Sequence, residues 1–545
     1  MTPSVTAAPL LTRQNLLRDR VMLSAWVYLV TVGVASNAYG LRRLYPTPAA
    51  RAAFAASSGH NPSLLFLYGR FPDAQSLGAI SSWRYGVWAA LFAALMSVFT
   101  VIRHSRADEE TGRAELTGAA AVGRLAGLTA ALATALAVNA ALAAAMAAVL
   151  VALGLPAAGS VAFALAVACC GLAFAGVAAV AAQLAEGART ARGIAIAVLA
   201  AAFGFRAVGD AAGAAGPSWL SWLSPLGWAE LVFPYSAARW WLLTLPLALA
   251  LAAAAAAFVL VGRRDYGAGL VPARPGPPRA PVWLRGPLGL AWLLQRGPLA
   301  GWVAGFVFIF AASGAAAQGI GSLLSGSAQL RRAFTRLGGQ AGLSSTSLTS
   351  AYLAAIMSLA GLAAAAYATS AVLRLRSEET AGRAEPLLAT AAGRIRWAFG
   401  HLAVVVAGTA ALLAVAGLAA GLGYGLRVSS APGSAAGTEV ARMLGAALVQ
   451  LPAALAVAAV AVAAFGMVPR AAVAGSWTVL GVVLAADLFG QVLQLPGWLL
   501  GVSPFAHVPR LPGVPFTPAP LAWLALAAVL LAAAGLAGLR TRDIG

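Results

Sequence analysis

Two short segments far apart in the sequence carry the same order of arginine and glutamate. RADEETGRAELTGAAAVGR at 106–124 and RSEETAGRAEPLLATAAGR at 376–394 match at ten of nineteen positions when laid over each other without a gap. Each is the densest cluster of charge in its half of the chain and lies between long apolar stretches. A chain this apolar does not need a repeated polar motif for solubility alone. We therefore interpret these first and second charged segments as docking points.

The spacing of the charges favours short helices. Arg and Glu side chains three or four residues apart can pair along a helix, and the sequence predicts the pairs Glu109–Arg113 and Glu379–Arg383. A helix held between two membrane spans can pass a push from a soluble partner into the membrane. The alternative is a charge-paired loop that only fixes the topology of the chain.

Ionisable residues near the apolar stretches are the second group of candidates. Arg206 and Asp210 are four residues apart in one stretch, and Asp487 lies in the matching stretch of the second half. A charged residue within a span is a functional candidate by default. The alternatives are an internal Arg–Asp pair and, for Asp210, a place near the outer interface. Glu230 lies within a Trp-rich segment, and we expect it at the membrane interface.

The composition is that of an integral membrane protein. Of its 545 residues, 61% are hydrophobic and only 10% are charged, with a mean hydropathy of +0.84, whereas soluble domains carry about 25% charged residues. Apolar stretches of about 20 residues, enough to cross a roughly 30 Å hydrocarbon core as a helix, recur along the chain. They are continuously apolar rather than alternating, which favours helices over a barrel.

The net charge of +20 does not indicate nucleic-acid binding, because the Arg residues lie singly or in pairs at the ends of apolar stretches. All 36 basic residues are Arg, so the Lys that a phosphate-binding P-loop requires is missing. Any ATP hydrolysis must therefore come from a partner. The four His residues have no metal-ligand spacing, and no nucleophile–base arrangement stands out. We predict no catalytic residue, no metal site and no cofactor in this chain.

The apolar stretches predict an all-α membrane fold of twelve spans in two tandem six-span halves of the same orientation. The halves are 1–264 and 288–545, joined by a Pro-rich linker at 265–287. The Arg distribution places both termini, the linker and both charged segments in the cytoplasm. The predicted spans lie at about 21–41, 83–102, 126–153, 160–184, 194–213, 242–262, 299–320, 351–373, 397–424, 440–465, 471–494 and 521–539.

Three features flank these spans. Short amphipathic surface helices are predicted at 9–20 and 288–296, and a polar loop at 42–82. A Trp- and Pro-rich segment precedes the last span of each half. Trp favours the membrane interface and Pro interrupts helices, so each segment is predicted to be a hairpin that dips into the membrane from outside. The residues that mark the two hairpins are Trp219, Pro225, Glu230, Trp498 and Pro504.

The motif E-E-x-G-R-x-E, at 109–115, resembles the coupling loop of bacterial ABC exporter permeases of the second type. The duplicated form in one chain of this length is similar to actinobacterial exporters of polyketide, ionophore and related antibiotics, with a type V exporter-like fold. The resemblance covers the whole chain. In the second segment Thr380 replaces Glu110 and Pro386 replaces Leu116, so the two docking sites are not expected to be equivalent.

The resemblance implies a permease subunit in the bacterial plasma membrane that exports amphipathic, antibiotic- or lipid-like compounds and so confers antibiotic resistance. A homodimer of a separate soluble ATPase, which binds ATP and Mg, would dock on both segments. The coupling residues that it implies are Arg106, Glu109, Gly112, Arg113, Glu115, Arg124, Arg376, Glu379, Gly382, Arg383, Glu385 and Arg394.

Two other classes remain as alternatives. A proton-coupled secondary drug transporter can also have twelve spans in two parallel halves, although the Trp- and Pro-rich hairpins are no part of that plan. A membrane enzyme acting on lipids or glycans would need a cluster of polar catalytic residues at one interface, and the sequence presents none.

Overall fold

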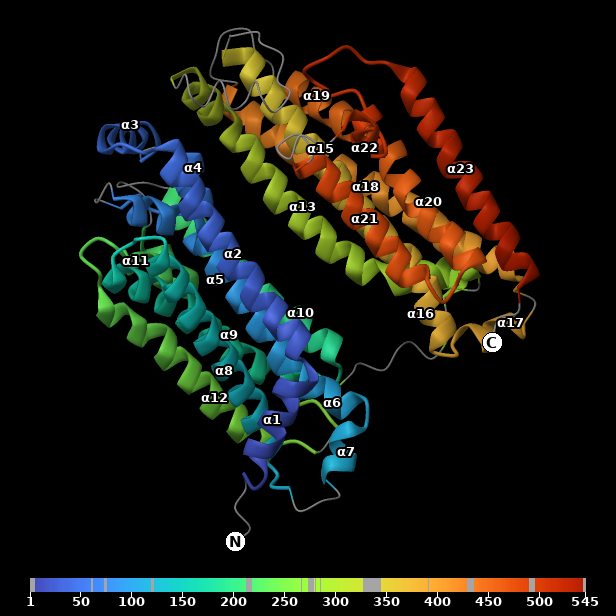
Figure 1. Ribbon diagram of the computed structural model, residues 1–545. Coiled ribbons are helices and arrows are strands. Elements are labelled where there is room, and N and C mark those ends of the chain that lie inside the picture. Colours follow the sequence, from blue (N-terminus) through green and yellow to red (C-terminus); the bar gives the residue numbers. More distant parts are fainter. Residues whose placement is uncertain are drawn as a thin grey trace. The chain divides into compact units, whose positions relative to one another are not determined.

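The computed structural model describes residues 5–59, 62–72, 76–118, 122–211, 218–265, 267–272, 279, 281–284, 286–326, 345–390, 392–428, 436–489 and 496–542. Over these residues the chain is helical and has no β-strand (Figure 1). It divides into two compact units, Met1–Gly276 and Pro277–Gly545. The boundary falls within the predicted linker, whose residues 273–278 lie outside the described ranges.

The first unit is a bundle of long helices with short ones at both ends (Figure 1). The central helix is α9, which packs against α5, α8, α10 and α12 and is rich in Ala and Gly. Its helices are α1 (Ala8–Arg18), α2 (Arg20–Leu44), α3 (Pro48–Ser58), α4 (Pro62–Tyr68), α5 (Leu77–Arg103), α6 (Arg106–Glu110), α7 (Arg113–Gly118), α8 (Ala126–Ala152), α9 (Ala157–Leu184), α10 (Ala188–Ala211), η1 (Ser218–Leu223), α11 (Pro225–Leu231), η2 (Trp240–Leu243) and α12 (Thr244–Gly262).

The second unit repeats this plan with differences in helix breaks. Its helices are η3 (Val282–Leu284), α13 (Pro287–Gly326), α15 (Ser345–Val372), α16 (Arg374–Thr380), α17 (Ala384–Leu388), α18 (Arg394–Val428), α19 (Ala436–Leu448), α20 (Leu451–Met467), α21 (Ala472–Phe489), α22 (Gly497–Leu500), η4 (Pro504–His507) and α23 (Pro518–Thr541). Here α20 is the helix that packs against α15, α18, α21 and α23.

Small residues allow the helices to approach closely. A Cβ atom on Gly466 of α20 would lie 1.8 Å from the carbonyl oxygen of Gly535 in α23. A Cβ on Gly535 would in turn lie 2.4 Å from the carbonyl of Val462. Small residues at helix contacts are the usual means of packing in membranes, where lipid removes the hydrophobic drive to associate.

Eleven helices of the described chain are long and apolar enough to cross a membrane, and they fall on eleven of the twelve predicted spans. The remaining prediction, 471–494, coincides with α21, whose apolar part Ala472–Asp487 is shorter than the others. Its predicted end, 490–494, lies outside the described residues. The structure therefore confirms an all-α, multi-pass membrane protein, and the count of twelve crossings stays a prediction.

Two local predictions are wrong. The expected surface helix at 288–296 is not separate from the span after it, because α13 runs unbroken from Pro287 to Gly326 with Pro298 inside it. In the first unit the matching helix does end, at Asp19, between α1 and α2. The polar loop expected at 42–82 contains two short helices, α3 and α4.

Candidate functional sites

Each charged segment folds into two short helices joined by a short turn that contains one glycine. Gly112 lies between α6 and α7 with φ +72°, and Gly382 lies between α16 and α17 with φ +67°. A Cβ atom at either position would meet nothing within 4 Å. Glycine is therefore required here because the backbone is left-handed where the helix ends. Close packing of another part of the described chain against the glycine is not the reason.

One glutamate in each segment, Glu109 in the first and Glu379 in the second, anchors the segment to the end of the last helix of its unit. Glu109 accepts hydrogen bonds from Arg106 at 2.7 Å and from Arg264 at 2.6 Å. In the second unit, Glu379 lies 3.2 Å from Arg376 and 2.8 Å from Arg542. The side chains of Glu109 and Glu379 are only 14% and 5% exposed.

The predicted pairs Glu109–Arg113 and Glu379–Arg383 are therefore wrong. Arg113 lies 3.8 Å from Asp108, and Arg383 donates to Glu378 at 2.7 Å. The hydrogen bond to Glu378 raises the pKa of Arg383. Both arginines lie beyond the glycine that ends the helix, so the spacing along a continuous helix does not apply to them.

Further arginines strengthen the anchor in both units. Arg124 donates to the carbonyls of Val261 and Arg264 at 3.2 and 3.3 Å, and Arg394 donates to the carbonyl of Arg542 at 2.7 Å. Arg106 is buried and donates to the carbonyls of Glu186, Gly267 and Ala268. Each charged segment is thus fastened at several points to the end of the bundle that carries it.

The residues left at the surface are those after the glycine. Arg113 and Arg383 have side chains 61% and 56% exposed, and Glu115 and Glu385 are also exposed. Beside Glu115, Leu116 is 79% exposed. The predicted coupling residues thus include two groups. Glu109, Glu379 and their arginines hold the segments, whereas Arg113, Glu115, Arg383 and Glu385 are exposed.

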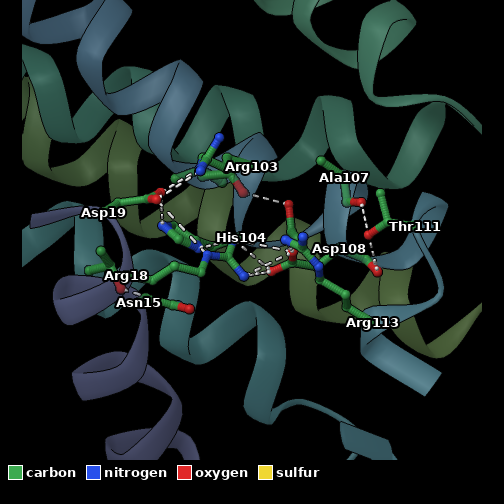
Figure 2. Close-up of polar contacts among 12 residues, drawn as sticks. Asn15, Arg18, Asp19, Arg103, His104, Ala107, Asp108, Thr111 and Arg113 are labelled. Atoms are coloured by element: carbon green, nitrogen blue, oxygen red, sulfur yellow. Dashed lines mark hydrogen bonds and ion pairs between the residues drawn. The ribbon is translucent and has the colours of Figure 1, made fainter. Parts of the chain in front are cut away.

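The first segment has a second attachment, to the N-terminal helix (Figure 2). Arg18 of α1 pairs with Asp108 at 3.2 Å. Asp19 accepts a hydrogen bond from Arg103 at 2.8 Å and lies 3.1 Å from Nε2 of His104. In the second unit Gln295 takes the sequence place of Asp19 and contacts His401 of α18. There, Glu378 pairs with Arg374, at the start of α16, and with Arg383.

At the opposite end of the first bundle, Arg206 and Asp210 form the internal pair that the sequence left open. Their closest atoms are 3.2 Å apart, and both side chains are almost fully buried. Glu230, expected at the interface, instead has a side chain only 7% exposed and lies 3.2 Å from Arg206. Arg70 lies 3.3 Å from Asp210. This buried charge cluster joins α10, α11 and the turn after α4, which no sequence spacing indicated.

Asp487 has a simpler environment. Ser503 donates a hydrogen bond to its Oδ2 at 2.6 Å, and the side chain is partly exposed. In the hairpins, Trp219 and Trp498 are 62% and 73% exposed. Pro225 and Pro504 begin α11 and η4, whose first turns are capped by the serine before each proline.

Among the described residues, no group of three or more His, Cys, Asp or Glu could hold a metal ion. The fold is that of a multi-pass helical membrane protein with one charged segment anchored to each of its two bundles.

The comparisons with known proteins identify the family. A family model for the C-terminal domain of the multidrug efflux system permease Rv1217c matches residues 284–540. The chain is 43% identical over 535 residues to the multidrug efflux system permease protein Rv1217c of Mycobacterium tuberculosis, covering 98% of this chain and 94% of that protein. The chain belongs to this family of actinobacterial efflux permeases, which confirms the resemblance drawn from the charged segments.

Proposed function

We propose that this chain is the membrane subunit of an ATP-driven ABC exporter of amphipathic, drug-like compounds. A homodimer of a separate soluble ATPase supplies the energy by docking on the two charged segments. The subunit lies in the bacterial plasma membrane with both termini in the cytoplasm, as the distribution of Arg favours. The relative from M. tuberculosis is by its name a multidrug efflux permease, and export of several drugs is the corresponding proposal here.

The observation that supports the proposal most directly is the duplicated anchor. In each unit a buried glutamate holds the charged segment against the end of the last helix. A segment fixed in this way moves together with its bundle, so a force applied to it by an ATPase reaches the helices. Beyond the glycine of each segment, the exposed Arg113 and Glu115, and Arg383 and Glu385, offer a partner both signs of charge to bind.

The anchor also decides which residues a docking experiment must change. Reversing Glu109 and Glu379 would break the fold of the segments themselves, because both carboxylates are bound to buried or half-buried arginines. Glu115 and Glu385 are exposed and leave the anchors intact.

The test is co-purification with a candidate ABC ATPase, such as one encoded by a neighbouring gene. We expect two ATPase chains per permease for the wild type, and loss of the ATPase from the double variant Glu115→Arg with Glu385→Arg. Arg43→Glu, a reversal on α2 near its end distant from the charged segments, is the matched control and should retain the ATPase. Failure of any ATPase to bind the wild type would instead favour a proton-coupled transporter.

A further inference from the structure

Each unit carries one aspartate near the end of its fifth apolar helix, held by a serine of the following hairpin. Ser221 donates to Asp210 at 2.7 Å, and Ser503 donates to Asp487 at 2.6 Å. Apart from this shared hydrogen bond, the two carboxylates differ in whether arginines pair with them.

Asp210 is fully compensated. Its side chain is 1% exposed and lies 3.2 Å from Arg206 and 3.3 Å from Arg70. With Glu230 the cluster brings together two arginines and two carboxyl groups. Gly69 makes room for it, since a Cβ there would lie 2.1 Å from the Glu230 carboxylate. This is how a buried carboxylate is held when its role is structural.

Asp487 has no such partner among the described residues. One helical turn before it stands Val483, buried, where Arg206 stands one turn before Asp210. The positive charge of Arg510 favours the ionised form of Asp487, but the two side chains form no ion pair in the described structure. A negative charge near apolar surface with only a hydroxyl to satisfy it is costly, and a charge kept inside a span is a functional candidate.

The surroundings of Ser503 hold a second unsatisfied polar group. Gln450 is 2% exposed, and its Oε1 has no hydrogen-bond partner in the described structure. Gln450 stands at the break between α19 and α20, where Pro452 cannot donate a backbone hydrogen bond. A Cβ built on Gly361 would lie 3.0 Å from this Oε1 and 2.8 Å from the ring of Phe505. An aromatic ring and an unpaired acceptor therefore meet beside the serine that holds Asp487.

We propose that Asp487 binds the positively charged nitrogen of cationic amphipathic substrates, and that the ring of Phe505 and the amide oxygen of Gln450 complete the site. A carboxylate supplies the opposite charge, an amide oxygen accepts from an ammonium N–H, and an aromatic face attracts a cation. The inference rests on the proposed export function and adds to it the class of substrate and one residue that selects it. Asp210, closed by its own arginines, has no part in this recognition.

The experiment compares two fluorescent probes with the purified permease in nanodiscs. One is a dansyl amphiphile that ends in a primary ammonium, and the other is the same amphiphile ending in a neutral hydroxyl. We expect Asp487→Asn to weaken binding of the cationic probe about tenfold or more, which corresponds to about 1.4 kcal/mol. Binding of the neutral probe should not change, and Asp487→Glu should retain most of the cationic affinity.

Val483→Arg provides an independent variant that keeps the carboxylate. It places an arginine one turn before Asp487, as Arg206 stands before Asp210, and should reproduce the loss of cation binding by occupying the carboxylate internally. Unchanged binding of the cationic probe in both Asp487→Asn and Val483→Arg overturns the proposal. Equal weakening of both probes, or no binding of either probe by the wild type, also overturns it.

Failure of the export function would look different. Vesicles that contain the permease with its ATPase would then accumulate neither probe on addition of ATP, while the charge-dependent difference in binding would persist. Transport by the vesicles without any charge-dependent effect of Asp487→Asn on binding would contradict only the role of Asp487.

Discussion

Removing the charge of Glu109 should release the first charged segment from the end of α12. In the wild type its carboxylate binds Arg106 at 2.7 Å and Arg264 at 2.6 Å, and these arginine side chains are 1% and 6% exposed. Breaking a buried ion pair by removing one partner costs about 3–5 kcal/mol. Glu109→Gln should cost less, because Arg106 keeps its carbonyl partners and Arg264 keeps Gln183.

A cost of about 2 kcal/mol follows if Glu109→Gln loses the charge and retains one hydrogen bond to the amide oxygen. This corresponds to about thirtyfold more frequent local opening. Hydrogen–deuterium exchange of the protein in nanodiscs measures it directly, as faster exchange of peptides from 106–118 and 263–272. Glu115→Gln, on the exposed side of the same segment, is the control and should leave both peptides as in the wild type.

Equal amide exchange in Glu109→Gln and the wild type would refute the reasoning, since the ion pairs of Glu109 would then not stabilise the segment. Faster exchange spread over the whole first unit would also refute it, because the anchor joins two segments only. Glu379→Gln should repeat the effect in the second unit, at 374–388 and at the end of α23.

Three further substitutions test other contacts. Gly112→Ala should destabilise the first segment by about 1 kcal/mol, because alanine disfavours the φ of +72° at this position. Gly187→Ala is the control: its Cβ would also meet nothing within 4 Å, but its φ is not positive, so stability should not change. Thermal unfolding monitored by proteolysis compares the two variants. Gly69→Ala should disrupt the buried charge cluster, since its Cβ would lie 2.1 Å from the Glu230 carboxylate, and should lower the yield of folded protein in size-exclusion chromatography; retention of wild-type yield and unfolding temperature would contradict this. Asp19→Asn should loosen α1 from the end of α5, seen as faster amide exchange in α1 with unchanged exchange at 374–388 in the second unit.

The sequence predicted the long helices well because each depends on a local property. A continuous apolar stretch of sufficient length has few alternatives to a membrane helix, and eleven predicted spans coincide with such helices. The break between α1 and α2 agrees with the prediction, whereas the continuity of α13 does not. Pro298 indicates a helix boundary, yet tertiary packing carries α13 through it.

Pairing of charges could be predicted only where it was local. The four-residue spacing of Arg206 and Asp210 survives in the structure because both lie in one uninterrupted helix, α10. The same spacing failed for Glu109 and Arg113, since Gly112 ends the helix between them. The true partner, Arg264, lies far along the chain. Its only signal was the similar charged ending of the last span in both halves.

The burial of Glu230 had no local signal at all. A glutamate in a Trp-rich segment fits an interface by composition, and only the packing of α11 against α10 and the turn after α4 brings it to Arg206. Residues whose role depends on three separate segments lie beyond what spacing can reveal.

The position of the anchoring arginines bears on how such a chain could arise. Arg264 lies before the linker and belongs to the same half as Glu109, and Arg542 belongs to the same half as Glu379. Each half therefore contains both the glutamate and the arginine of its own anchor. A gene encoding one half would already have specified a complete anchored segment, so duplication and fusion required no new contact to hold it. The same arrangement makes the chain a good candidate for expression as two separate polypeptides divided within 273–278.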